Sequence, residues 1–310
     1  MLIGSKLPPV HVDKTYFNFG RSAFAYLIEE IIKPKKVYLP AFTCWSLVST
    51  MHKRFSDIEL EFYSVEKDLK CNYPKTIEKG EVLVFIHFFG HENKQPLPEK
   101  KGGVILEDIS HALASNIKYR GDYIFGSLRK SMKVADGGII LNHFFNPIYE
   151  KGNNLDSWLR YEAFDWKDMR EAENMIDRHW EIRDISSQSL EVFLTTNMDL
   201  VKNQRYKNEK YLYNNINIGE PLLNFSKNEA PLVHNRIIET QEKRDYVRKE
   251  LAQKGIFTSI HWPTHEAVKK YSNYFPDIIF LENHIISIPV SQDFNLNDME
   301  YISKTINSII

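Results

Sequence analysis

Residues 121–141 read GDYIFGSLRKSMKVADGGIIL, and the interpretation of the chain starts from them. Two apolar runs, YIFGSL and GGIIL, are typical of strands, and Lys130 lies in the turn that joins them. Ser127 and Arg129 precede this lysine, and a pair of glycines follows it. A lysine amine at a strand end, beside a hydroxyl and a guanidinium, is a candidate for covalent chemistry with a carbonyl group. Taken alone, the pattern is more typical of a surface turn, so the rest of the chain has to support this interpretation.

The composition is that of an ordinary globular protein. The 310 residues are 43% hydrophobic and 26% charged, with a formal net charge of -1, and they can form one large core and one small one. Without a basic excess, nucleic-acid binding is not expected. The sequence contains no run of about 20 apolar residues that could span a membrane. Its first 14 residues have no apolar core of a secretion signal, so we expect a cytoplasmic protein.

Neither the cysteines nor the histidines indicate a metal site. The two cysteines, Cys44 and Cys71, are too few for a disulfide framework or a cysteine-rich zinc site. His261 and His265 have a spacing that would place them on one helix face. A Trp-Pro pair between them makes a helix unfavourable there, so we expect no metal.

Strand-like and helix-like segments alternate through the first half of the chain. Helical periodicity covers residues 22–33 and 41–55, and the strand-like segments are KKVYLP (35–40), IELEFYSV (58–65), EVLVFIHFFG (81–90), GVILEDISH (103–111), YIFGSL (123–128) and GGIILNHFF (137–145). This alternation favours an α/β fold with a mainly parallel sheet. Open sheets of this class bind ligands at the carboxyl edge, where the loops after the strands meet.

The second half has a different character. NPIYEKGNN (146–154) is typical of a loop, 156–182 is expected to be helical, and 186–216 is expected to form one longer helix. Further on, strands are expected in APLVHNRIIE (230–239), FTSIHWP (257–263) and IISIPV (285–290), with helices over 240–255 and 297–310. We therefore expect a large domain over residues 1–200, a bridging helix to about residue 216, and a small α+β domain over 217–310.

Two loops that precede helices are candidates for ligand contacts. Gly20, Arg21 and Ser22 lie at a helix start, where backbone N–H groups and the helix dipole favour a phosphate, although Ser22 could equally serve only as the N-cap. Thr43, Cys44 and Trp45 follow a strand and begin the next helix. They are therefore expected at the ligand-binding edge, with a place in the core as the alternative for Trp45.

Asp108 ends the buried strand GVILED, where a carboxylate without a partner would be costly. A cationic ring nitrogen would offset that cost, and capping of the next turn is the alternative role. A phosphate seat, a strand-end acid and an amine together match the needs of pyridoxal phosphate. In this interpretation Asp108 keeps the ring nitrogen protonated. Lys130 forms the Schiff base and then moves a proton as general base and acid.

The motifs also resemble a known family. GRSAF, LPAFTCWS, VFIHFFG, ILEDISHAL and GSLRKSMKVADGG are similar to successive motifs of the DegT/DnrJ/StrS family, the sugar aminotransferases of pyridoxal-phosphate fold type I. APLVHNRII, KGIFTSIHWP and ISIPVSQDFNLNDMEYI resemble segments of its small domain. The resemblance implies a seven-stranded, mainly parallel sheet in the large domain and a small carboxyl-terminal α+β domain. It also implies a homodimer with active sites at the subunit interface.

The resemblance assigns roles to individual residues. Lys130 matches the Schiff-base lysine by its distance from the glycine pair, whereas Lys133 does not. Asp108 matches the aspartate on the ring nitrogen, and Ser127 the serine that contacts the phosphate. His111, within ILEDISHAL, belongs to the implied cofactor-binding set.

The chain departs from the family pattern at several positions. Gly20, Arg21 and Ser22 stand where the family has Ser-Gly-Thr, so Arg21 could supply by charge what a hydroxyl would supply. Cys44, after Thr43, takes the place of an aromatic that stacks on the cofactor in many members, and Trp45 is displaced by one position. In place of an Asn-Tyr-Arg run that reaches the partner's site the chain has EIRDISSQ, where Arg183 is the nearest candidate.

The resulting expectation is an aminotransferase that moves an amino group from glutamate to a keto sugar, bound as a nucleotide conjugate, in polysaccharide or secondary-metabolite biosynthesis. Two alternatives stay open. One is a pyridoxal-phosphate lyase or aldolase acting on an amino acid. The other is a protein of this fold that binds without turnover.

Overall fold

The computed structural model describes residues 13–145, 147, 166–179 and 181–309. Apart from residue 147, the loop expected over 146–154 lies outside the described residues. So do residues 156–165, the first part of the helix expected over 156–182. Its second part is described as the helix α4, Trp166–His179.

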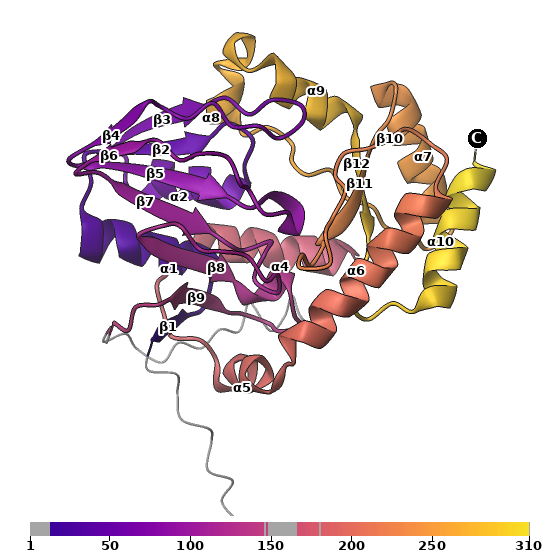
Figure 1. Cartoon of the computed structure of the whole chain (residues 1–310), viewed down its shortest axis with the longest axis horizontal. Coiled ribbons are helices and arrows are strands. Elements are labelled where there is room, and N and C mark those ends of the chain that lie inside the picture. Colours follow the sequence, from indigo (N-terminus) through magenta and orange to yellow (C-terminus); the bar gives the residue numbers. More distant parts are fainter. Residues whose placement is uncertain (1–12, 146, 148–165, 180, 310) are drawn as a thin grey trace, which may run out of the picture.

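A seven-stranded sheet forms the larger part of the molecule, in the order β1-β9-β8-β7-β5-β2-β3 (Figure 1). Its strands are β1 (Lys14–Phe17), β2 (Lys36–Pro40), β3 (Glu59–Tyr63), β5 (Glu81–Ile86), β7 (Val104–Asp108), β8 (Tyr123–Ser127) and β9 (Gly138–Leu141). The neighbours from β8 to β3 pair in parallel, and β9 and β1 are added antiparallel at one edge. The expected seven-stranded, mainly parallel sheet is confirmed.

The central strands are buried along almost their whole length, as both faces of a parallel sheet are usually covered. The helix α1 (Gly20–Tyr26) packs against β8 and β9, and α2 (Trp45–Arg54) lies beside α1. Short elements accompany the sheet: the π-helix η1 (Leu27–Ile32), the 3₁₀ turns η2 (Phe88–Gly90) and η3 (Leu128–Lys130), and a two-stranded parallel pair, β4 (Thr76–Glu78) with β6 (Glu99–Lys101). This small pair and the edge strand β1 were not expected from the sequence.

The first helix differs from the expectation at both ends. It begins at Gly20, so Phe19 occupies the N-cap position and the interpretation of Ser22 as N-cap is wrong. From Leu27 the backbone continues as the π-helix η1 and ends at Lys33, which has a left-handed conformation (φ 51°). The start of the helix is therefore two residues closer to the strand before it than the apolar periodicity indicated.

The carboxyl-terminal part contains a three-stranded antiparallel sheet and its own apolar cluster. The strands are β10 (Glu220–Pro221), β11 (Val233–Ile237) and β12 (Ile285–Pro289), and the helices are α7 (Gln241–Gln253), α8 (Glu266–Lys269), η4 (Ser272–Tyr274), α9 (Pro276–His284) and α10 (Leu296–Ser308). Thr240 caps α7 by accepting a hydrogen bond from Lys243 N, as expected. The strand expected at 257–263 is wrong, because that segment forms only an isolated bridge between Ser259 and Ser287.

The single helix expected over 186–216 is also wrong. The structure has α5 (Ser187–Thr195) and α6 (Met198–Asn215), because the Asn197 side chain accepts from two backbone N–H groups and starts a new helix. The helix α6 packs against both β11 and α10 and runs from near α5 along the small sheet (Figure 1). The bridging role of this helix and the domain boundaries at 200 and 217 stay predictions. None of the described helices is long and apolar enough to cross a membrane.

Candidate cofactor-binding site

A cavity of 390 Å³ lies at the carboxyl edge of the large sheet. The strands β5, β7 and β8 end at it with Ile86, Asp108 and Ser127, and the segment 259–262 of the carboxyl-terminal part closes another side. The cavity brings together nearly all the residues chosen from the sequence: Gly20, Arg21, Thr43, Cys44, Trp45, Asp108, His111, Ser127 and Lys130. Ser22 is fully buried and does not line it.

Lys130 ends the turn η3, and its side chain is exposed in the cavity. Gly137 makes this turn possible, because it has φ 136° and an added Cβ would lie 2.8 Å from Leu128 Cδ1. Leu128 N donates to Gly137 O at 3.0 Å and closes the loop. Lys133, the competing lysine, is exposed elsewhere and does not line the cavity.

Asp108 lies at the end of β7 with 6% of its surface exposed. Its Oδ1 accepts a hydrogen bond from Ser110 N at 2.7 Å, so it caps the next turn and also faces the cavity. Burial raises the pKa of Asp108, and the hydrogen bonds from Ser110 and the charge of Lys130 oppose this effect. Because the pKa is raised in the folded state, ionisation of Asp108 at neutral pH lowers the stability of the fold, and a cation bound against it would restore that stability.

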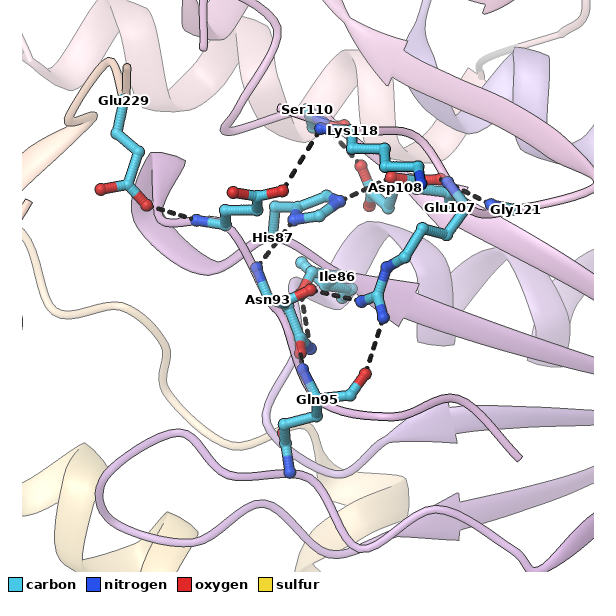
Figure 2. A network of polar contacts seen from close by, with 12 residues as sticks. Ile86, His87, Asn93, Gln95, Glu107, Asp108, Ser110, Lys118, Gly121 and Glu229 are labelled. Atoms are coloured by element: carbon cyan, nitrogen blue, oxygen red, sulfur yellow. Dashed lines mark hydrogen bonds and ion pairs between the residues drawn. The ribbon is translucent and has the colours of Figure 1, made fainter. Parts of the chain in front are cut away.

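Glu107 points to the other side of β7, as neighbouring side chains in a strand do. It is fully buried and accepts from His87 Nε2 at 2.7 Å and from the backbone N–H of Gly121 at 2.7 Å (Figure 2). Asn93 N donates to His87 Nδ1, which fixes the tautomer that donates to Glu107 from Nε2. This network joins the ends of β5 and β7 and so stabilises the strand that places Asp108.

The start of α1 lies directly against the end of β8. An added Cβ at Gly20 would lie 3.0 Å from Ser127 Cβ, so only glycine allows this close approach. Arg21 and Arg129 extend into the same region. Their guanidinium groups form ion pairs with Asp177 and Glu173 of α4, each at 2.5 Å. Two ion pairs and a helix start therefore meet at one end of the cavity.

The residues after β2 line a second side. The Thr43 Oγ1 atom is buried and has no hydrogen-bond partner among the described residues. Cys44 is half-buried at the N-cap of α2. Trp45 is 45% exposed, so the alternative of a core residue is wrong, and its indole N–H donates to Pro263 O at 2.5 Å. Both Cys44 and Trp45 line the cavity, and Trp45 is held toward the carboxyl-terminal part.

The sequence interpretation missed an aromatic wall. Trp262 is 8% exposed and stacks on His111 with ring centroids 5.3 Å apart and on Phe89 at 5.6 Å. His261 lines the cavity beside it. Burial and the nearby Lys130 charge lower the pKa of His261 to about 3, and the same two causes, with smaller effects of His261 and Arg205, hold that of His111 well below its usual value. Both imidazoles are therefore neutral at neutral pH.

Arg183, His261 and His265 were also singled out from the sequence. Arg183, the candidate for reaching a partner subunit, lies beside β1, where its backbone exchanges hydrogen bonds with Asn18, and it does not line the cavity of its own chain. His261 and His265 are on different sides of the segment, since His265 caps α8 and stacks on His52. Within the described part of the chain no group of three or more potential metal ligands occurs.

Solved structures with a similar fold include sugar aminotransferases. Spr1654 from Streptococcus pneumoniae, assigned as a sugar aminotransferase and solved in a PLP form, matches with a TM-score of 0.64 and 16% identity over 96% of this chain and 86% of that one. The sugar aminotransferase CalS13 from Micromonospora echinospora matches with a TM-score of 0.64 and 14% identity over 95% and 87% of the two chains. Helicobacter pylori PseC, an aminotransferase of pseudoaminic acid biosynthesis, matches with a TM-score of 0.63 and 12% identity over 96% and 86%.

No family model matches the sequence, and no curated protein matches it. At 12–16% identity the structural likeness establishes the fold. The fold-type-I architecture implied by the motifs is therefore confirmed over almost the whole chain, and the resemblance to the DegT/DnrJ/StrS family is confirmed at the level of the fold.

Proposed function

We propose that this protein is a pyridoxal-phosphate-dependent aminotransferase that moves an amino group from glutamate to a keto sugar carried on a nucleotide. The observation that carries the proposal is the convergence of Lys130, Asp108 and the start of α1 on one cavity of 390 Å³. These three parts come from η3, β7 and α1, which lie far apart in the sequence. They supply an amine, an acid and a phosphate seat, which are the groups that this cofactor needs.

The residues present fit the cofactor in three respects. Asp108 is buried and forms no ion pair with the described residues, which suits a protonated ring nitrogen. Thr43 Oγ1 and His261 Nδ1 are buried polar atoms without partners among the described residues, and they suit polar substituents. The start of α1, Ser127 and two guanidinium groups suit a phosphate.

When bound, pyridoxal phosphate supplies an aldehyde for the amino group and a ring that withdraws electrons from the substrate carbon. Asp108 then holds the proton of the ring nitrogen by charge. Lys130 would hold the cofactor through its amine, and the same amine would serve as the base and acid at the substrate carbon. His111 and Trp262 form a stacked pair in the wall of this cavity.

The choice of a keto sugar as acceptor is supported by the neighbours of the same fold, several of which are named as sugar aminotransferases. Arg21 and Arg129 lie at one end of the cavity, each ion-paired with a carboxylate of α4, and an anionic ligand would compete with Asp177 and Glu173 for these guanidinium groups. We extend the proposal to a homodimer in the cytoplasm, as the family resemblance implies. Size-exclusion chromatography with light scattering would test the dimer.

The cofactor experiment uses the purified full chain. After addition of pyridoxal phosphate, a visible absorbance band is expected, and borohydride reduction is expected to leave the cofactor on the peptide that contains Lys130. Lys130→Ala should lose the trapped product, and the exposed Lys133→Ala is the matched control that should retain it.

The amino-donor experiment follows the same band. Glutamate should convert bound pyridoxal phosphate into the pyridoxamine form. A band that persists with glutamate but changes with another amino acid through loss of carbon dioxide or bond cleavage would favour the lyase or aldolase alternative. Absence of any bound cofactor would refute the proposal.

A further inference from the structure

Arg205 of α6 is a buried guanidinium that contacts the backbone of the Lys130 turn. Its side chain is 5% exposed, and Nη2 donates to Lys130 O at 2.9 Å. Its Nε donates to Gln292 Oε1 at 2.7 Å. These contacts join residues that are 75 and 87 positions apart in the sequence.

Gln292 makes the same connection from the carboxyl-terminal part. It follows β12, and its Nε2 donates to Ser131 O at 3.3 Å. Two neighbouring carbonyl groups, of Lys130 and Ser131, are therefore each held by one of these two side chains. Arg205, Gln292 and the two carbonyl groups form a chain of contacts that we name the carbonyl clamp.

The segment that carries Gln292 is itself attached to α6. Asn208 Nδ2 donates to Ser291 O at 2.8 Å and to Phe294 O at 3.1 Å. Gln204 Nε2 also donates to Phe294 O at 3.1 Å. Gln204, directly before Arg205, and Asn208, three positions after it, thus fix the segment that the carbonyl clamp uses. The position of the Lys130 turn therefore depends on α6 and on the carboxyl-terminal part together.

The charge of Arg205 has no ion-pair partner among the residues that the structure describes. Asp293 stabilises the guanidinium from a distance, but its own carboxylate is exposed and accepts from Ser291 Oγ. Burial of a cation between neutral acceptors is costly. Arg236 is equally buried and also holds two backbone carbonyl groups, so what connects Arg205 to the site is the identity of its acceptor, Lys130 O.

We propose that Arg205 and Gln292 are positioning residues for Lys130: the carbonyl clamp fixes the turn from which the amine leaves and couples it to the carboxyl-terminal part. The inference rests on the proposed function. A displacement of a reacting group by about 1 Å lowers the reaction rate by roughly a hundredfold. Loss of the carbonyl clamp should therefore slow the reaction of Lys130 with an aldehyde and leave the cavity itself intact.

Two probes of the full-length protein separate an effect on the reaction of Lys130 from an effect on ligand binding in the cavity. Pyridoxamine 5′-phosphate carries an amine where pyridoxal phosphate carries the aldehyde, so its affinity reports the cavity without Lys130 chemistry. The rate at which pyridoxal phosphate becomes borohydride-trappable on Lys130 reports the placement of the amine. In Arg205→Met we expect pyridoxamine phosphate affinity within about threefold of wild type and a trapping rate about 10- to 100-fold lower.

Arg236→Met is the matched control. Arg236 is also 5% exposed and also donates to two backbone carbonyls, Ile218 O and Gly219 O, but it has no contact with the Lys130 turn. Its trapping rate should stay within about threefold of wild type. Gln292→Leu changes a partly exposed side chain, so it should fold even if Arg205→Met does not. Its expected trapping rate is about 3- to 10-fold lower at unchanged pyridoxamine phosphate affinity.

The results distinguish a failure of this inference from a failure of the proposed function. Unchanged trapping rates in Arg205→Met and Gln292→Leu would overturn the inference while leaving the proposed function intact. A parallel loss of both probes in these variants would assign the two residues a structural role and also overturn it. A wild-type protein that binds neither probe would refute the proposed function, and the inference with it.

Discussion

Replacement of His261 by asparagine should make the fold less sensitive to acid. The pKa of His261 is lowered from 6.5 to about 3, first because the ring is buried and then because Lys130 is close. In the unfolded chain this imidazole takes up a proton below pH 6.5, whereas in the folded chain it stays neutral. Folding stability is therefore complete above pH 6.5 and is lost progressively as the pH falls toward about 3.

The size of the effect follows from the difference between the pKa values of His261 in the unfolded and the folded chain. Each pKa unit corresponds to about 1.4 kcal/mol, so at pH 5.0 the unfolded state gains about 2 kcal/mol from protonation of His261. At pH 7.5 this contribution is below about 0.1 kcal/mol. The wild-type protein should therefore lose about 2 kcal/mol more than His261→Asn between the two pH values.

Urea unfolding of the cofactor-free protein at pH 7.5 and pH 5.0 measures this difference. Protein concentration and salt are held equal, and the free energies of unfolding are compared between the two chains. The unfolding curves above pH 7.5 serve as the internal control, because the two chains should there depend on pH in the same way. An equal loss of free energy in wild type and His261→Asn between pH 7.5 and pH 5.0 would refute the proposed burial of a neutral imidazole.

Two further predictions concern close packing and the cavity wall. In Gly138→Ala the new Cβ would lie 1.9 Å from Phe19 O, so the free energy of unfolding should fall by about 3 kcal/mol. In Gly255→Ala the new Cβ meets nothing within 4 Å, so the loss should be only about 1 kcal/mol, from positive-φ strain. Urea unfolding of both variants measures these losses, and equal losses would contradict the prediction. Alkylation at pH 8 should modify Cys44 and spare Cys71, because burial raises the pKa of the Cys71 thiol to about 12. Pyridoxal phosphate should slow the reaction of Cys44, and peptide mass spectrometry after timed quenching would show whether it does.

The fold was largely predictable because its central strands are nearly continuous apolar runs. EVLVFI and VILED are buried along almost their whole length, and such runs are typical of a parallel sheet covered on both faces. The edge strand β1 could not be predicted in the same way, since Lys14–Phe17 is only four residues long and pairs with β9 through contacts more than 120 positions apart. The break at Asn197 had a local signal, an N-cap residue inside a helical pattern, that the long periodic run concealed.

The candidate site also has a part that local sequence predicted and a part that it did not. Asp108 and Lys130 each end a strand or the turn that follows one, so local sequence placed them at the ligand-binding edge. Trp262 and Arg205 reach the cavity or its lysine only through tertiary packing between the two sheets. No spacing rule links a buried arginine on one helix to a carbonyl group 75 residues away. The wrong prediction of a strand over 257–263 gave no reason to expect Trp262 in the cavity wall.

One part of the site therefore depends on contacts within the large sheet, and the other on contacts with α6 and the carboxyl-terminal part. Gly20, Asp108 and Ser127 are placed by neighbouring elements of one sheet, so this half of the cavity can form when the large sheet forms. Lys130 belongs to the same sheet by sequence, but its backbone carbonyl is held by α6, and the next carbonyl is held by the segment after β12. Docking of the carboxyl-terminal part thus completes the position of the one residue that forms a covalent bond in the proposed reaction. Under the proposed function, one part of the chain would bind the phosphate and the other would position the amine.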